Sequence, residues 1–189
     1  MKIPALLKSK IALITMLLLG GCVRLPEGVA PVANFEVGRY LGTWYEIARL
    51  DHSFERGLSQ VTAQYSMGEG GAILVINRGY DQAAKKWKEA RGRAYFVESP
   101  QTGRLKVSFF GPFYGGYNIV ELDHEQYSYA LVCGPNRSYL WILSRTSTLN
   151  EAKLQTLVAK AKALGFDTDR LIYVEHEPRD SRPGAPPGS

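Results

Sequence analysis

Gly-Thr-Trp-Tyr-Glu-Ile-Ala-Arg, residues 42–49, is the stretch around which the rest of the chain is organised. Trp, Tyr and Ile favour the pleated, half-buried surface of a sheet, so the stretch predicts a β-strand. Gly42 stands just before the bulky residues and leaves room for the Trp44 indole to turn inward. We therefore expect Trp44 to plug the closed end of a small β-barrel.

Further short β-like runs follow, separated by turn signals such as Gly-Glu-Gly-Gly at 68–71. Eight strands at such even spacing predict an all-β antiparallel sandwich or barrel. Some runs, such as Ile-Leu-Val-Ile at 73–76, are apolar on both faces, so one face is expected to line a cavity and the other to pack against a helix or a neighbouring molecule. The expected strands cover residues 42–50, 58–67, 72–80, 87–98, 104–110, 116–123, 126–134 and 138–145.

The pattern changes after the eighth run. Thr-Leu-Asn-Glu at 148–151 fits a capping box, and apolar residues then recur at helical spacing up to Leu164. Gly165 is expected to end this helix. Because one helix face is apolar, we expect it to lie against the outside of the barrel. Residues 171–174, Leu-Ile-Tyr-Val, predict a short ninth strand.

The first 21 residues are typical of a secretory signal peptide, because lysines precede a nine-residue apolar core at 11–19. This core is shorter than the roughly 20 residues that a membrane-spanning helix needs. The Leu-Gly-Gly-Cys segment at 19–22 resembles the lipobox of bacterial lipoproteins, in which the cysteine becomes the acylated first residue. We therefore expect residues 1–21 to be removed as a lipoprotein signal and Cys22 to carry more than one acyl chain, palmitate among them, which anchors the chain stably.

Both ends of the remaining chain lack the pattern of a folded domain. Residues 22–34 contain two prolines and little periodicity, so they are expected to form a lipidated tether. Residues 178–189 contain four prolines and are expected to be a disordered tail. Residues 35–177 are the expected folded domain.

Charge and cysteine content narrow the class of protein. Without the three lysines of the signal segment the formal charge falls from +5 to +2, which gives no reason to expect a nucleic-acid partner. Cys133 is the second of two cysteines and ends an apolar run. Since Cys22 is expected to be acylated, we expect Cys133 to be a buried free thiol and predict no disulfide.

Gly42-x-Trp44, the distant Arg145 and a single helix after the eighth strand together resemble a lipocalin. With the lipobox, the chain is more similar still to the bacterial outer-membrane lipoprotein lipocalins of the Blc type. The likeness covers nearly all of residues 34–177. It implies an eight-stranded antiparallel up-and-down β-barrel with one C-terminal α-helix packed outside and a short ninth strand.

Up-and-down topology brings the start of the first strand and the end of the eighth to the same end of a closed barrel. Trp44 and Arg145 occupy these two positions, and an arginine over an indole face contributes roughly 0.5–2 kcal/mol. We expect Gly42, Trp44 and Arg145 to close the base of the barrel as structural residues.

The same topology places the loops at 51–57, 81–86, 111–116 and 134–138 at the open end. These loops are rich in aromatic residues and carry a slight positive charge, which suits an amphiphile with an anionic or zwitterionic head, although ordinary solvated loop charges explain the pattern equally well. Side-chain alternation, counted from Arg145 and along the other strands, predicts inward positions that include Ala90, Ala94, Val107 and Leu143. The alternative is that these side chains merely fill the core. The predicted ligand-binding residues are Ala63, Tyr65, Phe96, Phe109, Tyr114, Tyr129, Tyr139 and Trp141.

The sequence shows none of the motifs that would indicate catalysis or a metal. His52, His124 and His176 are isolated, and no second histidine follows at the spacing of a zinc helix. The Gly-x-Ser-x-Gly nucleophile elbow is also absent. We therefore predict no catalytic residue, no metal and no cofactor.

The resemblance implies a binding protein, anchored at the periplasmic face of the outer membrane, that binds or carries fatty acids or lysophospholipids. It further implies a role in membrane maintenance under stress and the capacity to form a homodimer. Two alternatives stay open. One is an enzyme acting on a lipid or pigment inside the same barrel with polar groups such as Tyr129, Tyr139 and Glu46. The other is an envelope scaffold whose barrel is packed solid.

Overall fold

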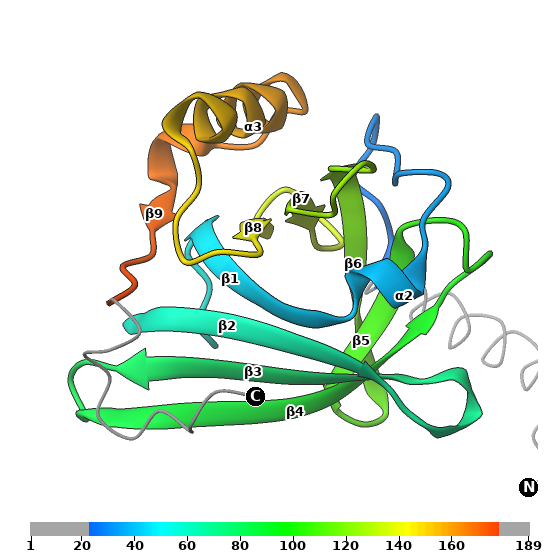
Figure 1. Cartoon of the computed structure of the whole chain (residues 1–189), viewed down its shortest axis with the longest axis horizontal. Coiled ribbons are helices and arrows are strands. Elements are labelled where there is room, and N and C mark those ends of the chain that lie inside the picture. The colour runs from blue at the N-terminus through cyan, green and yellow to red at the C-terminus, as the bar shows by residue number, and fades with distance from the viewer. Residues whose placement is uncertain (1–22, 178–189) are drawn as a thin grey trace, which may run out of the picture.

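The computed structural model describes residues 23–177, which form a closed antiparallel barrel with one long helix against its outside (Figure 1). Each strand pairs with the next in the chain, and β1 pairs with both β8 and β2, which closes the barrel. The predicted eight-stranded up-and-down barrel is therefore confirmed. The barrel strands are β1 (Gly42–Arg49), β2 (Leu58–Met67), β3 (Ile73–Asp81), β4 (Lys86–Phe96), β5 (Arg104–Phe110), β6 (Phe113–Leu122), β7 (Tyr129–Cys133) and β8 (Leu140–Ser144).

Alternation along the strands divides the apolar residues between two clusters. On β7, Ala130 and Val132 belong to the cluster inside the barrel, whereas Leu131 and Cys133 belong to the cluster under the helix. This explains why such strands are apolar on both faces. On β3 the outward Leu74 and Ile76 are only half-buried, because β3 lies on the side of the barrel away from the helix (Figure 1).

The long helix, α3 (Glu151–Ala163), begins where the side chain of Asn150 accepts a hydrogen bond from the backbone N–H of Lys153. The N-cap is therefore Asn150, two residues after the Thr148 that the capping-box pattern proposed. Leu154 and Leu157 are buried against the outer cluster, and Gly165 follows the helix with a φ of +83°. None of the helices among residues 23–177 is long and apolar enough to cross a membrane.

β9 (Ile172–Tyr173) pairs with the end of β1. It lies along the same edge of β1 as β2, which pairs with the start of β1. This is the predicted short ninth strand, and it lies outside the eight-stranded ring. Two short 3₁₀ turns, Glu69–Gly71 and Thr168–Arg170, complete the connections together with a one-turn helix, α2 (Val37–Tyr40), that sequence patterning did not predict. α2 directly precedes β1 and brings Tyr40 under the barrel.

The described part of the expected tether, residues 23–34, lies on the barrel wall. The backbone N–H of Val32 donates to the carbonyl of Ile119 at 2.8 Å, and the N–H of Gly103 donates to Val32 at 2.9 Å. Val29 is buried in the outer cluster. The apolar side chains of this segment, which periodicity did not reveal, hold it in place. The predicted signal segment, the Cys22 acylation site and the predicted tail at 178–189 lie outside the described residues.

Cys133 is a free, buried cysteine in the outer cluster. Burial raises the pKa of its thiol to about 12. A thiol with so high a pKa is almost entirely protonated at neutral pH and is a poor nucleophile. The residue therefore acts as a small apolar side chain under α3.

Candidate functional site

The base of the barrel is sealed by Trp44 and Arg145. The Trp44 side chain has no exposed surface, and its Nε1 donates to the backbone carbonyl of Tyr40 at 2.8 Å. The Arg145 guanidinium carbon lies 4.0 Å from the centre of the indole ring. Trp44 thus has an arginine on one side and the Tyr40 ring, with centres 4.7 Å apart, as a further neighbour.

Arg145 is held over Trp44 by backbone carbonyls. Its Nη1 donates to Thr43 at 3.0 Å and its Nη2 to Arg39 at 2.7 Å. Gly42 has a φ of +97°, and a Cβ at this position would lie 3.4 Å from Arg145 Nη1. A glycine therefore fits both the backbone conformation and the close approach of the guanidinium. These residues close the barrel and leave the rest of its interior for other side chains.

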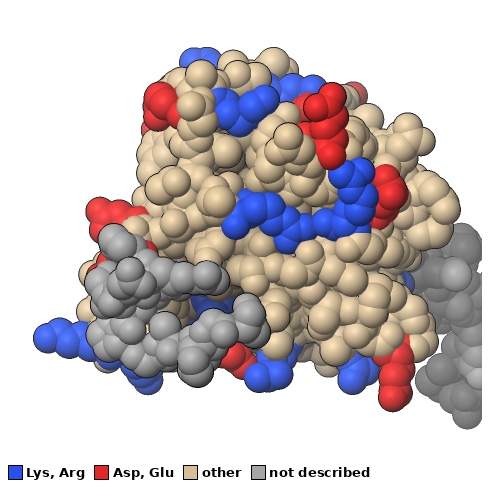
Figure 2. Space-filling view, viewed as in Figure 1, with Lys and Arg blue, Asp and Glu red and all other residues tan. Residues whose placement is uncertain are grey.

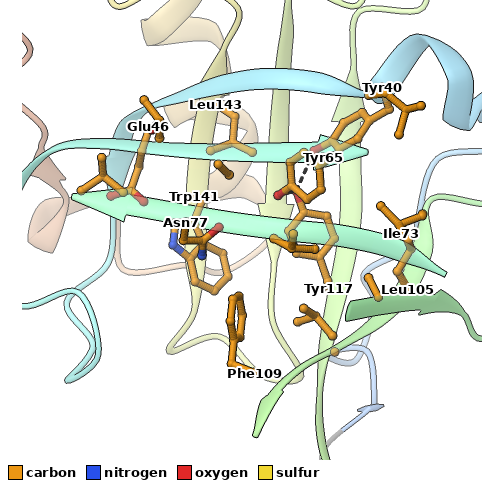
Figure 3. A pocket seen from close by; sticks show the side chains of 18 of the residues that line it. Tyr40, Glu46, Tyr65, Ile73, Asn77, Leu105, Phe109, Tyr117, Trp141 and Leu143 are labelled. Carbon is orange, nitrogen blue, oxygen red and sulfur yellow. Dashed lines mark hydrogen bonds between the residues drawn. The ribbon is translucent and has the colours of Figure 1, made fainter. Parts of the chain in front are cut away.

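Above this base lies a cavity with mostly apolar walls that opens at the other end of the barrel (Figure 3). Counted together with its mouth, it contains about 890 Å³ of space free of protein atoms. The lining residues are Phe35, Val37, Tyr40, Leu41, Glu46, Phe54, Glu55, Val61, Thr62, Ala63, Tyr65, Ile73, Val75, Asn77, Ala94, Leu105, Val107, Phe109, Gly116, Tyr117, Trp141 and Leu143.

Three tyrosine hydroxyls form a hydrogen-bonded floor toward the closed end of the cavity (Figure 3). The Tyr117 hydroxyl lies 2.7 Å from that of Tyr40 and 2.8 Å from that of Tyr65. Burial raises the pKa of all three phenols above the ordinary tyrosine value, so they stay neutral. The floor satisfies its own polar groups and presents ring faces to the cavity.

A polar wall lies nearer the mouth. Glu46 accepts a hydrogen bond from Arg49 Nη1 at 2.7 Å, and both residues are buried. Glu55, from the loop after β1, is also buried, and its Oε2 accepts from the indole Nε1 of Trp141 at 3.1 Å. Arg49 further donates to the backbone carbonyl of Glu55 at 3.0 Å. This network positions Trp141 on the cavity wall.

The polar wall places two buried carboxyls against one arginine. Burial raises the pKa of Glu46 well above its ordinary value, the nearby Glu55 raises it further, and Arg49 offsets this only in part. Burial also raises the pKa of Glu55. Because neutralisation costs less than burying an unpaired charge, a proton on one carboxyl, foremost on Glu46, is favoured. The wall is therefore close to neutral with a negative excess whenever that proton leaves.

Asn77 adds a hydrogen-bond acceptor to the cavity. Asn77 lines the cavity. Its Oδ1 is buried and has no hydrogen-bond partner among the described residues. Buried polar atoms are normally paired, so this oxygen is available to a donor on a bound molecule or to water.

His52 is buried among aromatic rings at the mouth. Its ring lies 4.1 Å from Phe54 and 5.0 Å from Trp141, measured between ring centres. His52 Nε2 is 3.2 Å from Glu55 Oε2, but the contact lacks hydrogen-bond geometry. Burial, together with the nearby Arg49 guanidinium, lowers the pKa of His52 to about 4. The imidazole is therefore neutral at neutral pH.

His52 is expected to make the stability of the domain fall in acid. The pKa of His52 is about 6.5 in the unfolded chain and about 4 in the folded one. Its contribution to the free energy of unfolding is therefore complete above pH 6.5 and is lost as the pH falls through 4. We expect His52→Gln to reduce the loss of unfolding free energy between pH 7 and pH 4.5 by about 2 kcal/mol. Urea unfolding at both pH values measures this, with His124→Gln on an exposed turn as the matched control. Identical pH dependence in His52→Gln and the parent chain would contradict the account.

The structure places four of the predicted ligand-binding residues on the cavity wall: Ala63, Tyr65, Phe109 and Trp141. The predicted inward positions Ala94, Val107 and Leu143 also line it. Phe96 packs against the inner cluster, with its ring centre 6.1 Å from that of Phe35, and lies beside the cavity. Tyr139 is part of the aromatic group at the mouth, where it stacks with Trp141. Ala90 pairs with Asn77 on β3 but is exposed.

Two of the predicted ligand-binding residues face outward. Tyr129 lies in the outer cluster, where its hydroxyl accepts from Lys153 Nζ of α3 at 3.2 Å. Its strand is apolar on both faces, so periodicity could not set its phase. Tyr114 lies with its ring under Lys106 Nζ, 5.0 Å away, on the outside of the barrel. The pairing of β5 with β6 shifts register between Val107 and Phe110, next to Tyr114, so the side-chain alternation of β5 cannot be carried across to this residue. The inward prediction for Tyr129 is wrong, and Tyr114, which was predicted to contact the ligand from the open-end loops, points away from the cavity.

Sequence reasoning did not include Glu55, Asn77 and Tyr117 among the ligand-facing residues. For Asn77 a signal existed, because it follows Ile73 and Val75 at the strand period of two. Glu55 belongs to a loop, and no periodicity predicts that its carboxyl turns inward to Trp141.

Comparison with known proteins agrees with this geometry. A family model described as a lipocalin-like domain matches residues 35–176. The chain is 59% identical over 160 residues to the outer membrane lipoprotein Blc of Vibrio cholerae, which covers 85% of this chain and 94% of that protein. It is 55% identical over 150 residues to the outer membrane lipoprotein Blc of Escherichia coli K12, with 79% of this chain and 84% of that protein covered.

Among solved structures, insecticyanin from the tobacco hornworm Manduca sexta superimposes with a TM-score of 0.66. The match covers 82% of this chain and 87% of the insecticyanin chain at 19% identity. At that identity the likeness shows a shared fold.

Proposed function

Because the chain belongs to the lipocalin family, we propose that it is a membrane-anchored protein whose barrel binds or carries one fatty acid or lysophospholipid in the cell envelope. The observation that carries the proposal is the cavity itself. It is sealed by Trp44 and Arg145 at one end, open at the other, and lined mainly by apolar and aromatic side chains. Such walls suit an acyl chain.

The proposed location is the periplasmic face of the outer membrane, with acylated Cys22 as the anchor. The relatives at 55–59% identity are named outer membrane lipoproteins, and residues 19–22 resemble a lipobox. A role in membrane maintenance under stress and a homodimeric state belong to the same proposal.

The charges of the polar wall favour one kind of lipid head group over another. Two buried carboxyls share one arginine there, so the wall has no free positive charge to pair with the carboxylate of a fatty acid, whereas an ammonium could pair with the Glu46 carboxylate once its proton leaves. A lysophospholipid with an ammonium in its head group therefore suits the wall better than a fatty acid. The acyl chain would lie between Phe109 and Leu143, toward the tyrosine floor.

A quenching titration tests lipid binding. The chain beginning at Val23 retains every described strand and helix and both clusters of buried residues. It is titrated with a fatty acid and a lysophospholipid that carry bromine on the acyl chain, because bromine quenches an indole at contact. We expect saturable quenching at one lipid per chain. Absence of saturable binding for both lipids would contradict the proposal.

Trp141 is expected to report the bound chain. Trp141 lines the cavity, whereas Trp44 is sealed beneath the floor and Trp87 lies on the outer face of β4, with the Arg78 guanidinium 5.0 Å from its ring centre. Trp141→Phe should therefore remove most of the quenching while a competition assay still detects binding, and Trp141→Ala should weaken binding itself. Trp87→Phe is the matched control and should leave the quenching intact. Undiminished quenching in Trp141→Phe would place the lipid elsewhere.

An enzyme acting on a lipid in the same barrel is the second candidate. The observation that favours it is the group of titratable side chains at the mouth, where His52 and Glu55 approach within 3.2 Å and both have shifted pKa values. Mass spectrometry of the lipid after prolonged incubation separates the two candidates. An unchanged lipid mass supports the carrier, and a new product supports the enzyme.

A further inference from the structure

We propose that the open end of the barrel is a membrane-docking surface, in which Phe54, Phe110 and Phe113 enter the surface of a phospholipid bilayer. This inference rests on the proposed acyl anchor at Cys22 and adds the orientation of the molecule: the mouth of the cavity faces the membrane. The partner of this surface is a lipid bilayer rather than another protein.

The first support is the exposure of three large apolar side chains at one end. Phe110 is 81% exposed, Phe113 is 79% exposed and Phe54 is 60% exposed. Phe110 and Phe113 flank the turn between β5 and β6, and Phe54 lies in the loop after β1. In an up-and-down barrel these two connections lie at the same end. Phe54 also lines the cavity, so the exposed apolar rim continues into the cavity wall.

The second support is charge. The connection between β3 and β4 lies at this same end and carries Lys85, which is exposed, and Lys86 follows it at the start of β4. Within residues 23–177, neither lysine has a carboxylate at salt-bridge distance, whereas Asp81 is paired with Lys88 at 2.7 Å. Figure 2 shows basic side chains, with some acidic ones among them, along the lower edge of the molecule, where β4 and this hairpin lie. Lysines at the same end of the barrel as exposed aromatic side chains suit an interface with anionic lipid.

The third support is the place where the anchor leaves the barrel. The described chain begins at Val23, the residue after Cys22. The carbonyl of Glu27 accepts from Arg137 Nη2 at 2.6 Å, and Arg137 belongs to the connection between β7 and β8 at the open end. The carbonyl of Arg24 lies 3.2 Å from the position that a Cβ of Gly116 would take, near the start of β6. Acyl chains on Cys22 would therefore enter a bilayer at the end of the barrel that carries the phenylalanines.

These three features together have a functional consequence. With the mouth against the bilayer, a single-chain lipid passes from the membrane into the cavity along the Phe54 rim without crossing open water. The arrangement also explains why the chain keeps large apolar side chains exposed, which is costly for a protein that faces only solvent.

Vesicle partitioning tests the proposal. The non-acylated chain beginning at Val23 is sedimented with vesicles of phosphatidylethanolamine and phosphatidylglycerol in equal parts, and the bound fraction is measured. Phe110→Ser combined with Phe113→Ser should lower the partition coefficient on the order of tenfold or more, because both side chains lose burial in the interface. Met67→Ser is the matched control: Met67 is 50% exposed but ends β2, at the closed end, and should leave partitioning unchanged.

Two further measurements decide the other outcomes. The lipid titration without vesicles should be unchanged in the double serine variant, so a loss of partitioning with intact lipid binding supports docking. Equal partitioning of the double variant and the parent chain overturns docking while leaving the cavity proposal untouched.

Sedimentation without vesicles is the third readout. If the parent chain is a dimer that the double variant abolishes, with vesicle binding unchanged, the phenylalanines join two copies of the chain and docking is again overturned.

Discussion

Replacing Trp44 by alanine is expected to lower the free energy of unfolding by about 3–5 kcal/mol, the range for truncating a large buried aromatic residue. Trp44 has no exposed surface, and the substitution removes its hydrogen bond to Tyr40 and the ring beneath Arg145. It also leaves a void at the base, where the chain cannot collapse easily because β1 is held by strands on both sides. Urea unfolding of the chain beginning at Val23 measures the effect.

Trp87→Ala is the matched control for this prediction. Trp87 lies on the outer face of β4, partly exposed, between Tyr80 and Arg78. Its truncation is expected to cost less than about 1.5 kcal/mol, because little apolar area leaves the protein interior. Equal losses for Trp44→Ala and Trp87→Ala would show that the seal at the base is not a main source of stability.

Filling the cavity is expected to have the largest effect on binding. Val107 lines the cavity from β5 and is only partly buried, so a larger side chain at this position projects into the free space. Val107→Trp should weaken the binding of fatty acid and lysophospholipid at least tenfold, at a cost in stability of about 1–3 kcal/mol from overpacking. Displacement of a fluorescent fatty acid measures the affinity.

The neighbouring residue provides the control. Lys106 points outward over the Tyr114 ring, so Lys106→Trp adds the same side chain to the same strand on the opposite face. Its affinity for lipid should stay within about twofold of the parent chain, which is within the ordinary effect of a surface change. If both variants bind as tightly as the parent chain, the ligand does not occupy the barrel interior.

Much of the fold was predictable because local signals agreed with one another. Turn residues separated the strands, Gly165 marked the end of the helix, and the spacing of Trp44 and Arg145 required a closed barrel to bring them together. The one-turn helix α2 escaped prediction because four residues carry too little periodicity. Tyr40 therefore could not be recognised as part of the base.

The candidate site was predictable only where strands alternate regularly. Trp141 and Leu143 on β8 were placed correctly on the inner face by counting back from Arg145. Tyr114 and Tyr129 were misplaced, one near a register shift and the other on a strand that is apolar on both faces. Glu55 depends on tertiary packing, because its carboxyl is held by the Trp141 indole from a strand 86 residues away.

The most direct test of the central claim, that the barrel interior holds the lipid, is the set of nuclear Overhauser effects between a bound lysophospholipid and the methyl groups of the protein. We predict effects from the acyl methylenes to Val75, Val107 and Leu143, which line the cavity. The effects should be absent at Ile172, which is exposed on β9. Effects confined to surface methyl groups such as those of Ile172, with none at the cavity residues, would contradict the account.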